Sequence, residues 1–165
     1  MKKHNLPVLF ITALVFSLLF SCKQNSALTT NEAASVKDSV LLMVTHTSKD
    51  ITTKGPIAWL DYFENSPDFF MASDGAIVFK DYQSADVFVK NTLVKALPKI
   101  DLKWNAIRVD VLTSQIAIVG ANFHEDLTDA TNKTTAVDGY FTATAHLTDK
   151  GWKYRDAHWS IKKGQ

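Results

Sequence analysis

The chain has 165 residues, of which 46% are hydrophobic and 21% charged, and its formal net charge at pH 7 is +1. This length suits one domain with an apolar core, and no internal repeat or second domain is evident. Basic and acidic residues are balanced and form no basic stripe, so we expect no nucleic-acid binding.

Residues 1–21 have the pattern of a secretory signal. A basic start precedes an apolar run from Leu6 to Phe20, which is shorter than the about 20 residues that a membrane-spanning helix needs. The run ends in Leu-Phe-Ser and then Cys22, the only cysteine of the chain. This ending resembles the lipobox of bacterial lipoproteins, in which cleavage leaves a lipid-modified cysteine at the new N-terminus. An ordinary secretory signal with an incidental cysteine is the alternative.

The segment after Cys22 is small and polar, so we interpret residues 22–31 as a flexible tether and residues 32–165 as the folded domain. Loss of two lysines with the signal leaves a net charge of −1. Lys23 occupies the position after the cysteine, where in many bacteria an aspartate marks lipoproteins that are retained in the inner membrane. The acidic run associated with surface display in some lipoproteins is absent from residues 23–27. By this analogy we expect a lipid anchor in the outer membrane, with the domain facing the periplasm.

Helices are predicted first along the domain. Thr29 and Glu32 have the spacing of a capping box, and apolar residues then recur on one helical face as far as Gly55. A second, short helix should follow, in which Trp59 and Phe63 stack one turn apart.

A hairpin and a third helix come next. Asp74-Gly75 separates two short apolar runs, which is typical of a hairpin turn. Asp81 can cap a third helix, and Pro98 stops it.

From residue 100 onward the apolar period is two, which predicts four antiparallel strands. The parity of the first strand flips between Trp104 and Ile107, as a β-bulge would produce. Residues 116–121 are apolar on both faces and predict a central strand covered on both sides. The fold class is therefore α+β, with three N-terminal helices packed on a strongly curved antiparallel sheet.

Three motifs carry a family resemblance: WLDYF at residues 59–63, FMASDG at residues 70–75 and GWKYRDAHWS at residues 151–160. With the order of elements, they resemble the nuclear-transport-factor-2-like superfamily, and within it the SnoaL-like, polyketide-cyclase-like domains of unknown function. The resemblance implies a cone-shaped fold, a pocket between helices and sheet, and often a homodimer. It implies no single activity, since the superfamily contains isomerases, dehydratases, epoxide hydrolases, scaffolds and binders.

The last hairpin decides which side chains face the pocket. A three-residue loop at residues 149–151 would pair residues whose numbers sum to 300. The pairs facing the helices would then be Phe141–Trp159, Ala143–Ala157, Ala145–Arg155 and Leu147–Lys153, and those on the other face Tyr140–Ser160, Thr142–His158, Thr144–Asp156 and His146–Tyr154. A slip of one residue would instead bring Asp156, His158 and Ser160 into the pocket.

Our leading hypothesis is non-catalytic binding of a small, partly apolar ligand or a protein partner. Dense aromatic residues can line a pocket for flat apolar ligands, and Arg155 at the rim would meet an anionic or polar group. The expected aromatic lining is Trp59, Tyr62, Phe63, Phe141 and Trp159.

Two alternatives stay open. A proton-transfer isomerase, dehydratase or cyclase would use His158 and Asp156 with Tyr140 as a hydrogen-bond donor, and it needs the slipped register. A structural homodimer would share the open sheet face, made of Tyr140, Thr142, Thr144, Trp152, Tyr154 and His158.

No metal or cofactor is expected, because no histidine pair has ligand spacing. The cluster His124-Glu125-Asp126 is interpreted as the solvated end of a strand.

Overall fold

The computed structural model describes residues 27–162. Its helices are α2 (Thr30–Lys54), the 3-10 helix η1 (Pro56–Asp61), α3 (Tyr82–Phe88), the π-helical turn η2 (Val89–Leu93) and α4 (Val94–Ala96). Its strands are β1 (Phe70–Ser73), β2 (Ala76–Phe79), β3 (Lys99–Val111), β4 (Ile116–Thr128), β5 (Thr134–Thr148) and β6 (Gly151–Ile161). The predicted signal peptide and residues 22–26 of the predicted tether, Cys22 among them, lie outside the described residues. The rest of the predicted tether is described, and its last two residues are helical, because α2 begins at Thr30.

Helix α2 begins with the predicted capping box. The Thr29 hydroxyl accepts a hydrogen bond from the Glu32 amide at 3.3 Å, and the Glu32 carboxylate accepts one from the Thr29 amide at 2.9 Å. The helix ends where Gly55 adopts a φ of 83°, a left-handed value that favours glycine. No helix in the described part of the chain is both long and apolar enough to span a membrane.

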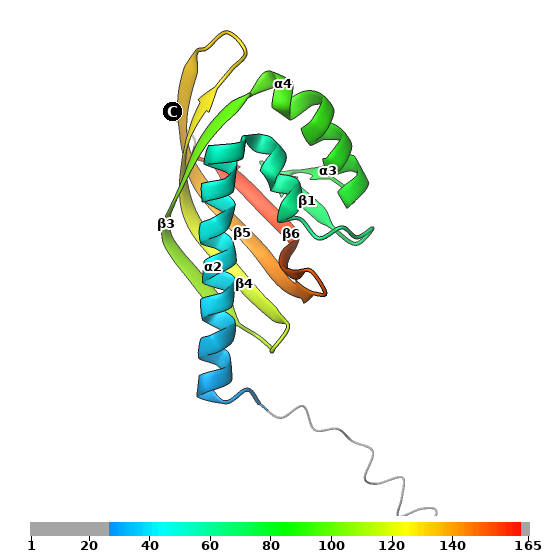
Figure 1. Ribbon diagram of the computed structural model, residues 1–165, viewed down its shortest axis with the longest axis vertical. Helices are drawn as coiled ribbons and strands as arrows, with labels where there is room; N and C mark the ends of the chain where they lie inside the picture. The colour runs from blue at the N-terminus through cyan, green and yellow to red at the C-terminus, as the bar shows by residue number, and fades with distance from the viewer. Residues whose placement is uncertain (1–26, 163–165) are drawn as a thin grey trace, which may run out of the picture.

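One curved sheet of six strands, in the order β2-β1-β6-β5-β4-β3, forms the body of the domain (Figure 1). Helix α2 lies across one face of the sheet, and the continuous helix α3-η2-α4 covers the same side farther along, near the β1–β2 hairpin. The hairpin joins the sheet because β1 pairs in parallel with β6, from Phe70–Asp156 to Ser73–Trp159. The predicted α+β architecture is confirmed, and the hairpin extends the predicted four-stranded meander to six strands.

The predicted bulge in β3 is confirmed. The pairing of β3 with β4 shifts between Asn105 and Arg108, and Ala106 has a φ of 50°. The prediction that β4 is covered on both faces is wrong for its outer face, because Ile118 is 36% exposed there. Strand β4 is also the second strand from the edge of the sheet rather than a central one.

The β5–β6 pairing follows the predicted register only in the part distant from the hairpin loop. Pairs from Tyr140–Ser160 to Thr144–Asp156 occur as predicted, but a bulge then shifts the rest by one residue. The three-residue loop is wrong, since Thr148 pairs with Gly151 across two loop residues. The pairs observed in place of Ala145–Arg155, His146–Tyr154 and Leu147–Lys153 are Ala145–Tyr154, His146–Lys153 and Leu147–Trp152.

This bulge turns Tyr154 into the core, where its side chain is fully buried. Its hydroxyl lies 3.3 Å from the Thr47 hydroxyl of α2. The predicted place of Tyr154 on the open sheet face is therefore wrong. The same holds for Trp152, which packs against the core. The indole N–H of Trp104 makes a second cross-link, donating to the Val44 carbonyl of α2 at 3.0 Å. Both bonds hold α2 against the inner face of the sheet.

Candidate functional site

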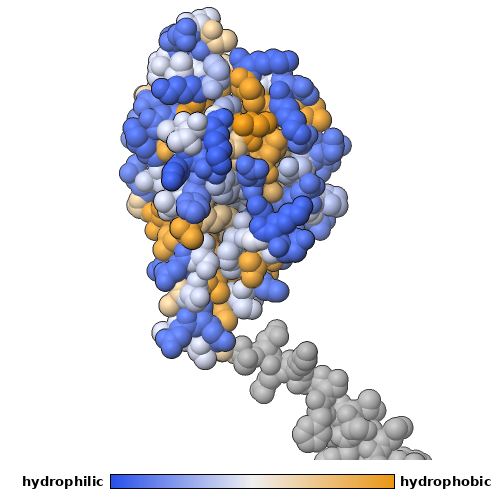
Figure 2. All heavy atoms as spheres, in the orientation of Figure 1, coloured by the Kyte–Doolittle hydropathy of each residue, from blue (hydrophilic) through white to orange (hydrophobic). Residues whose placement is uncertain are grey.

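A cavity of about 450 Å³ lies between the inner face of the sheet, η1, the hairpin and the α3-η2-α4 helix. Its walls combine aliphatic and aromatic side chains, with Ser73 and Glu125 as the polar exceptions. Hydrophobic side chains also reach the surface between η1 and the α3–α4 helix (Figure 2). The lining residues are Trp59, Phe63, Met71, Ser73, Val78, Phe79, Phe88, Val89, Leu93, Leu97, Ile100, Glu125, Leu127, Phe141, Trp159 and Ile161.

A connected aromatic cluster forms one wall. Trp59 stacks on Phe63 with ring centroids 5.6 Å apart, as predicted, and meets Trp159 edge-on at 5.5 Å. Trp159 also stacks on Phe123 at 4.1 Å and packs edge-on against Phe141 at 5.2 Å. Four of the predicted pocket residues, Trp59, Phe63, Phe141 and Trp159, therefore come together at this cavity. Their role in ligand binding stays a prediction.

Tyr62 and Arg155 do not line this cavity. The Tyr62 hydroxyl donates a 2.8 Å hydrogen bond to Asp50 of α2, and the phenol pKa is raised, chiefly by burial. Arg155 lies at the β6 bulge, with a guanidinium nitrogen 3.6 Å from the Asp68 carboxylate. The bulge is the reason that the predicted cation is missing from the cavity wall.

The residues of the predicted catalytic alternative lie on the opposite face of the sheet. His158 is exposed, and Tyr140 is 44% exposed. The Asp156 carboxylate accepts a 2.9 Å hydrogen bond from Thr144 across the strands. The slipped register that this alternative needs does not occur at these positions, so a proton-transfer site built on them inside the cone is wrong.

Glu125 is the acidic group that the sequence interpretation missed. It belongs to β4, is 6% exposed and lines the cavity. Its strand neighbours are the apolar Leu102 and Val137. Burial raises the pKa of the Glu125 carboxyl to about 7, and the charge of His124 opposes the shift only in part. Within residues 27–162 no donor is seen to hydrogen-bond this carboxyl.

A signal for Glu125 was present in the sequence. The buried residues Val119, Ala121 and Phe123 alternate along β4, and Glu125 continues the same parity. Its neighbours in sequence point to the outer face: His124 lies 2.8 Å from Asp138 and 3.5 Å from Asp126. The hydrogen bond to Asp138 is the main cause that raises the His124 pKa.

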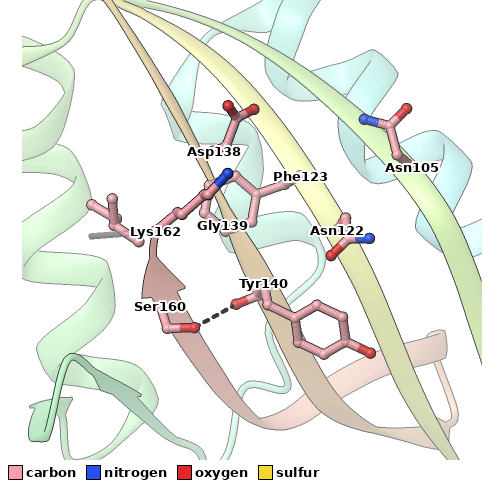
Figure 3. Close-up of a pocket in the computed structure, with 9 residues that line it drawn as sticks. Asn105, Asn122, Phe123, Asp138, Gly139, Tyr140, Ser160 and Lys162 are labelled. Atoms are coloured by element: carbon pink, nitrogen blue, oxygen red, sulfur yellow. Dashed lines mark hydrogen bonds between the residues drawn. The ribbon is translucent and has the colours of Figure 1, made fainter. Parts of the chain in front are cut away.

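The outer face carries a second hollow, of about 500 Å³, shown in Figure 3. Asn105 and Asn122 border it on one side, Lys162 and Asp138 on another, and the ring of Tyr140 lies below them. The Ser160 hydroxyl donates to the Tyr140 carbonyl at 3.2 Å. This hollow is polar and lacks a buried titratable group, so the inner cavity is the stronger candidate site. No group of His, Cys, Asp and Glu side chains within residues 27–162 could hold a metal ion.

Comparison with solved structures identifies the architecture. The chain superimposes with a TM-score of 0.67 on a nuclear-transport-factor-2-like superfamily protein from Salmonella enterica, at 18% identity over 79% of this chain and 95% of that one. A putative scytalone dehydratase from Novosphingobium aromaticivorans gives 0.70, at 11% identity over 81% and 89% of the two chains. The hexachlorocyclohexane dehydrochlorinase LinA-type3 from Novosphingobium barchaimii gives 0.63, at 8% identity over 83% and 97%.

No family model matches the chain, and no curated protein matches it in sequence. The structural likeness confirms the predicted cone fold of the nuclear-transport-factor-2-like superfamily. At these identities it establishes the fold alone, so function has to be argued from the cavity.

Proposed function

We propose that the protein binds a small, largely apolar molecule in the inner cavity. The observation that carries this proposal is the cavity itself: about 450 Å³ of space walled by aromatic and aliphatic side chains, with one buried carboxyl. Sites for small molecules have this volume and this mixture, in which apolar walls supply affinity and a few polar groups fix orientation. Named enzymes of the same fold act on small organic molecules, which agrees with such a use of the cone.

A fluorescent apolar probe tests the proposal. N-phenyl-1-naphthylamine is uncharged at neutral pH and brightens in an apolar site, so its titration into the protein should saturate at one site per chain. Leu93→Trp, which adds a large ring to the cavity wall, should weaken binding by at least about tenfold. Leu112→Trp is the matched control, because Leu112 is 57% exposed and lies outside the cavity. Equal binding by the two variants would contradict the proposal.

Proton transfer is a second candidate function, and the protonation of Glu125 favours it. A carboxyl with a pKa of about 7 exchanges its proton near neutral pH, which is the property of a general acid or base. Relatives in fold are named as a dehydratase and a dehydrochlorinase, and such eliminations require removal of a proton. This candidate predicts that a substrate's turnover follows one ionisation near pH 7 and is lost in Glu125→Gln. Turnover that survives this substitution would refute it.

We also propose that Cys22 carries lipid and anchors the domain in the bacterial cell envelope, at the outer membrane and facing the periplasm. The support is the signal-like residues 1–21 followed by the only cysteine. Each buried lipid CH₂ contributes about 0.8 kcal/mol, so two or more acyl chains would hold the protein firmly. Cys22→Ser should abolish labelling by a fatty-acid analogue. Correctly cleaved Cys22→Ser protein that still fractionates with membranes would contradict the anchor.

Homodimerisation through the outer sheet face is the remaining proposal on partners. Ile118, Tyr140 and Phe70 are apolar or aromatic side chains exposed on this face or beside it. Thr142, Thr144 and His158 lie among them, which gives the mixture of hydroxyl and aromatic groups found in interfaces. Light scattering of the domain without Cys22 should give twice the chain mass. A monomer at high concentration would exclude this dimer.

A further inference from the structure

The charge of the inner cavity differs from the charge that the sequence predicted. Arg155, the expected cation, lies outside it, and among residues 27–162 no lysine, arginine or histidine lines it. Glu125 is the one titratable side chain that lines the cavity within the described part of the chain. Among these described residues, a bound molecule therefore meets an acid and no fixed positive charge.

The aromatic walls have the same electrostatic preference. The face of an aromatic ring is negative, and it attracts a cation placed within about 6 Å of the ring centroid. Trp59, Phe63, Phe141 and Trp159 form a connected cluster on the cavity wall, with centroids between 5.2 and 5.6 Å apart. Glu125 lines the same cavity as this cluster, and Phe123, two residues before it on the same face of β4, stacks on Trp159 at 4.1 Å.

We propose that the cavity selects a small organic cation, which is an ammonium group on an apolar body. Glu125 would be its counter-ion, and the aromatic cluster of Trp59, Phe63, Phe141 and Trp159 would be its cage. This inference rests on the proposed function and names the class of ligand that the cavity takes. A quaternary or hydrophobic ammonium suits such a site, because it is weakly hydrated and is recognised by aromatic cages.

The other classes of ligand fit less well. An anion would lie beside a carboxylate with no cation to offset it, so repulsion and desolvation would both oppose binding. A neutral apolar molecule would fill the cavity but would leave an ionised Glu125 without a partner, which costs free energy in an apolar site. A cation removes that cost.

Binding of a cation should depend on pH through Glu125 alone. Up to residue 162, the elements packed around the carboxyl present no other titratable group to the cavity. His124, which acts on Glu125 by its charge, lies on the outer face of the same strand. The cavity residues from these elements are Ile100, Leu127, Phe141, Trp159, Ile161, Met71, Ser73, Val78, Phe79, Phe88, Val89, Leu93 and Leu97. A permanently charged ligand has no ionisation of its own, so any change of its affinity with pH reports the ionisation of the protein.

Benzyltrimethylammonium and neopentylbenzene are the test ligands, because they have the same shape and differ in one positive charge. Their dissociation constants are measured by tryptophan fluorescence at pH 8.5 and pH 5.5, with phenylacetate as the anionic comparison. The cation should bind at least about tenfold more tightly than its neutral isostere at pH 8.5, and this preference should shrink as Glu125 is protonated at pH 5.5.

Two variants identify the group responsible. Glu125→Gln should remove the preference for the cation and its pH dependence. Asp126→Asn is the matched control, because it neutralises the next carboxyl of β4 on the outer face, and it should keep both.

Each outcome separates the two proposals. If neopentylbenzene or phenylacetate binds as tightly as the cation at pH 8.5, the cation proposal is overturned and the apolar ligand site stands. If Glu125→Gln keeps the preference, Glu125 is not the counter-ion and the proposal is overturned. If none of the three compounds and no apolar fluorophore binds, the cavity is not a ligand site and both proposals fail.

Discussion

Glu125→Gln should stabilise the folded protein at and above neutral pH. The folded-state pKa of Glu125 is about 7 and its ordinary value is 4.5, so folding makes the carboxyl hold its proton more tightly. The stability contributed by this proton is complete below pH 4.5 and is lost as the pH rises through 7. The shift corresponds to about 3 kcal/mol of unfolding free energy at pH 8, at about 1.4 kcal/mol per unit. Glutamine has no charge to bury, so it avoids this loss.

Urea unfolding of wild type and Glu125→Gln at several pH values between 4 and 8.5 measures the effect. The two proteins should be about equally stable at pH 4, and the variant should be more stable by up to about 3 kcal/mol at pH 8. Taking the difference between the two curves removes the titration of all groups that they share. Asp126→Asn should show no such gain. A constant difference across the range, or a wild type that gains relative stability with rising pH, would refute a buried carboxyl of raised pKa.

Three further substitutions test the fold by urea unfolding. Gly139→Ala should lose about 3 kcal/mol, because a Cβ there would collide with the Ser160 carbonyl oxygen and the Phe123 ring; an unchanged midpoint would contradict this packing. Trp104→Phe removes the hydrogen bond to Val44 and should cost about 1 kcal/mol, so a loss well below that would mean that the bond does not hold α2 to β3. Thr29→Ala removes the α2 cap and should also cost about 1 kcal/mol, with lower helicity by circular dichroism; unaltered helicity would argue against the cap.

The elements of the fold could be predicted because local rules determine them. The capping box at Thr29 and the parity flip between Trp104 and Ile107 each predicted a feature that the structure contains. Two positions with positive φ, at Asp74 and Gly75, form the predicted hairpin turn. In each case neighbours in sequence are also the interacting groups.

Long-range pairing was harder to predict. The parallel contact between β1 and β6 joins residues 86 positions apart, and no local pattern near Phe70 specifies it. The second bulge, at Arg155, was missed because it interrupts the alternation only once, between Tyr154 and Ala157, and both of those residues are buried. Because of this bulge, Arg155 does not line the cavity, and the predicted site lacks its predicted cation.

The aromatic lining of the candidate site was predicted from the sequence, but its charged group was not. Trp59 and Trp159 were assigned to the pocket because dense aromatic residues in a small domain can line a site for flat apolar ligands, and both line the cavity. Glu125 was assigned to solvent because it stands between His124 and Asp126, although its parity along β4 places it inside. That interpretation gave more weight to the charged neighbours of Glu125 than to the alternation of buried residues along β4, and the alternation gave the correct placement.

A crystal structure of the protein soaked with benzyltrimethylammonium tests the central claim most directly. The account predicts electron density for the ligand inside the inner cavity, with its ammonium group against the Glu125 carboxyl and the rings of Trp59 and Trp159 around it. Ligand density confined to the outer hollow, or a cavity closed by its own side chains, would contradict the account.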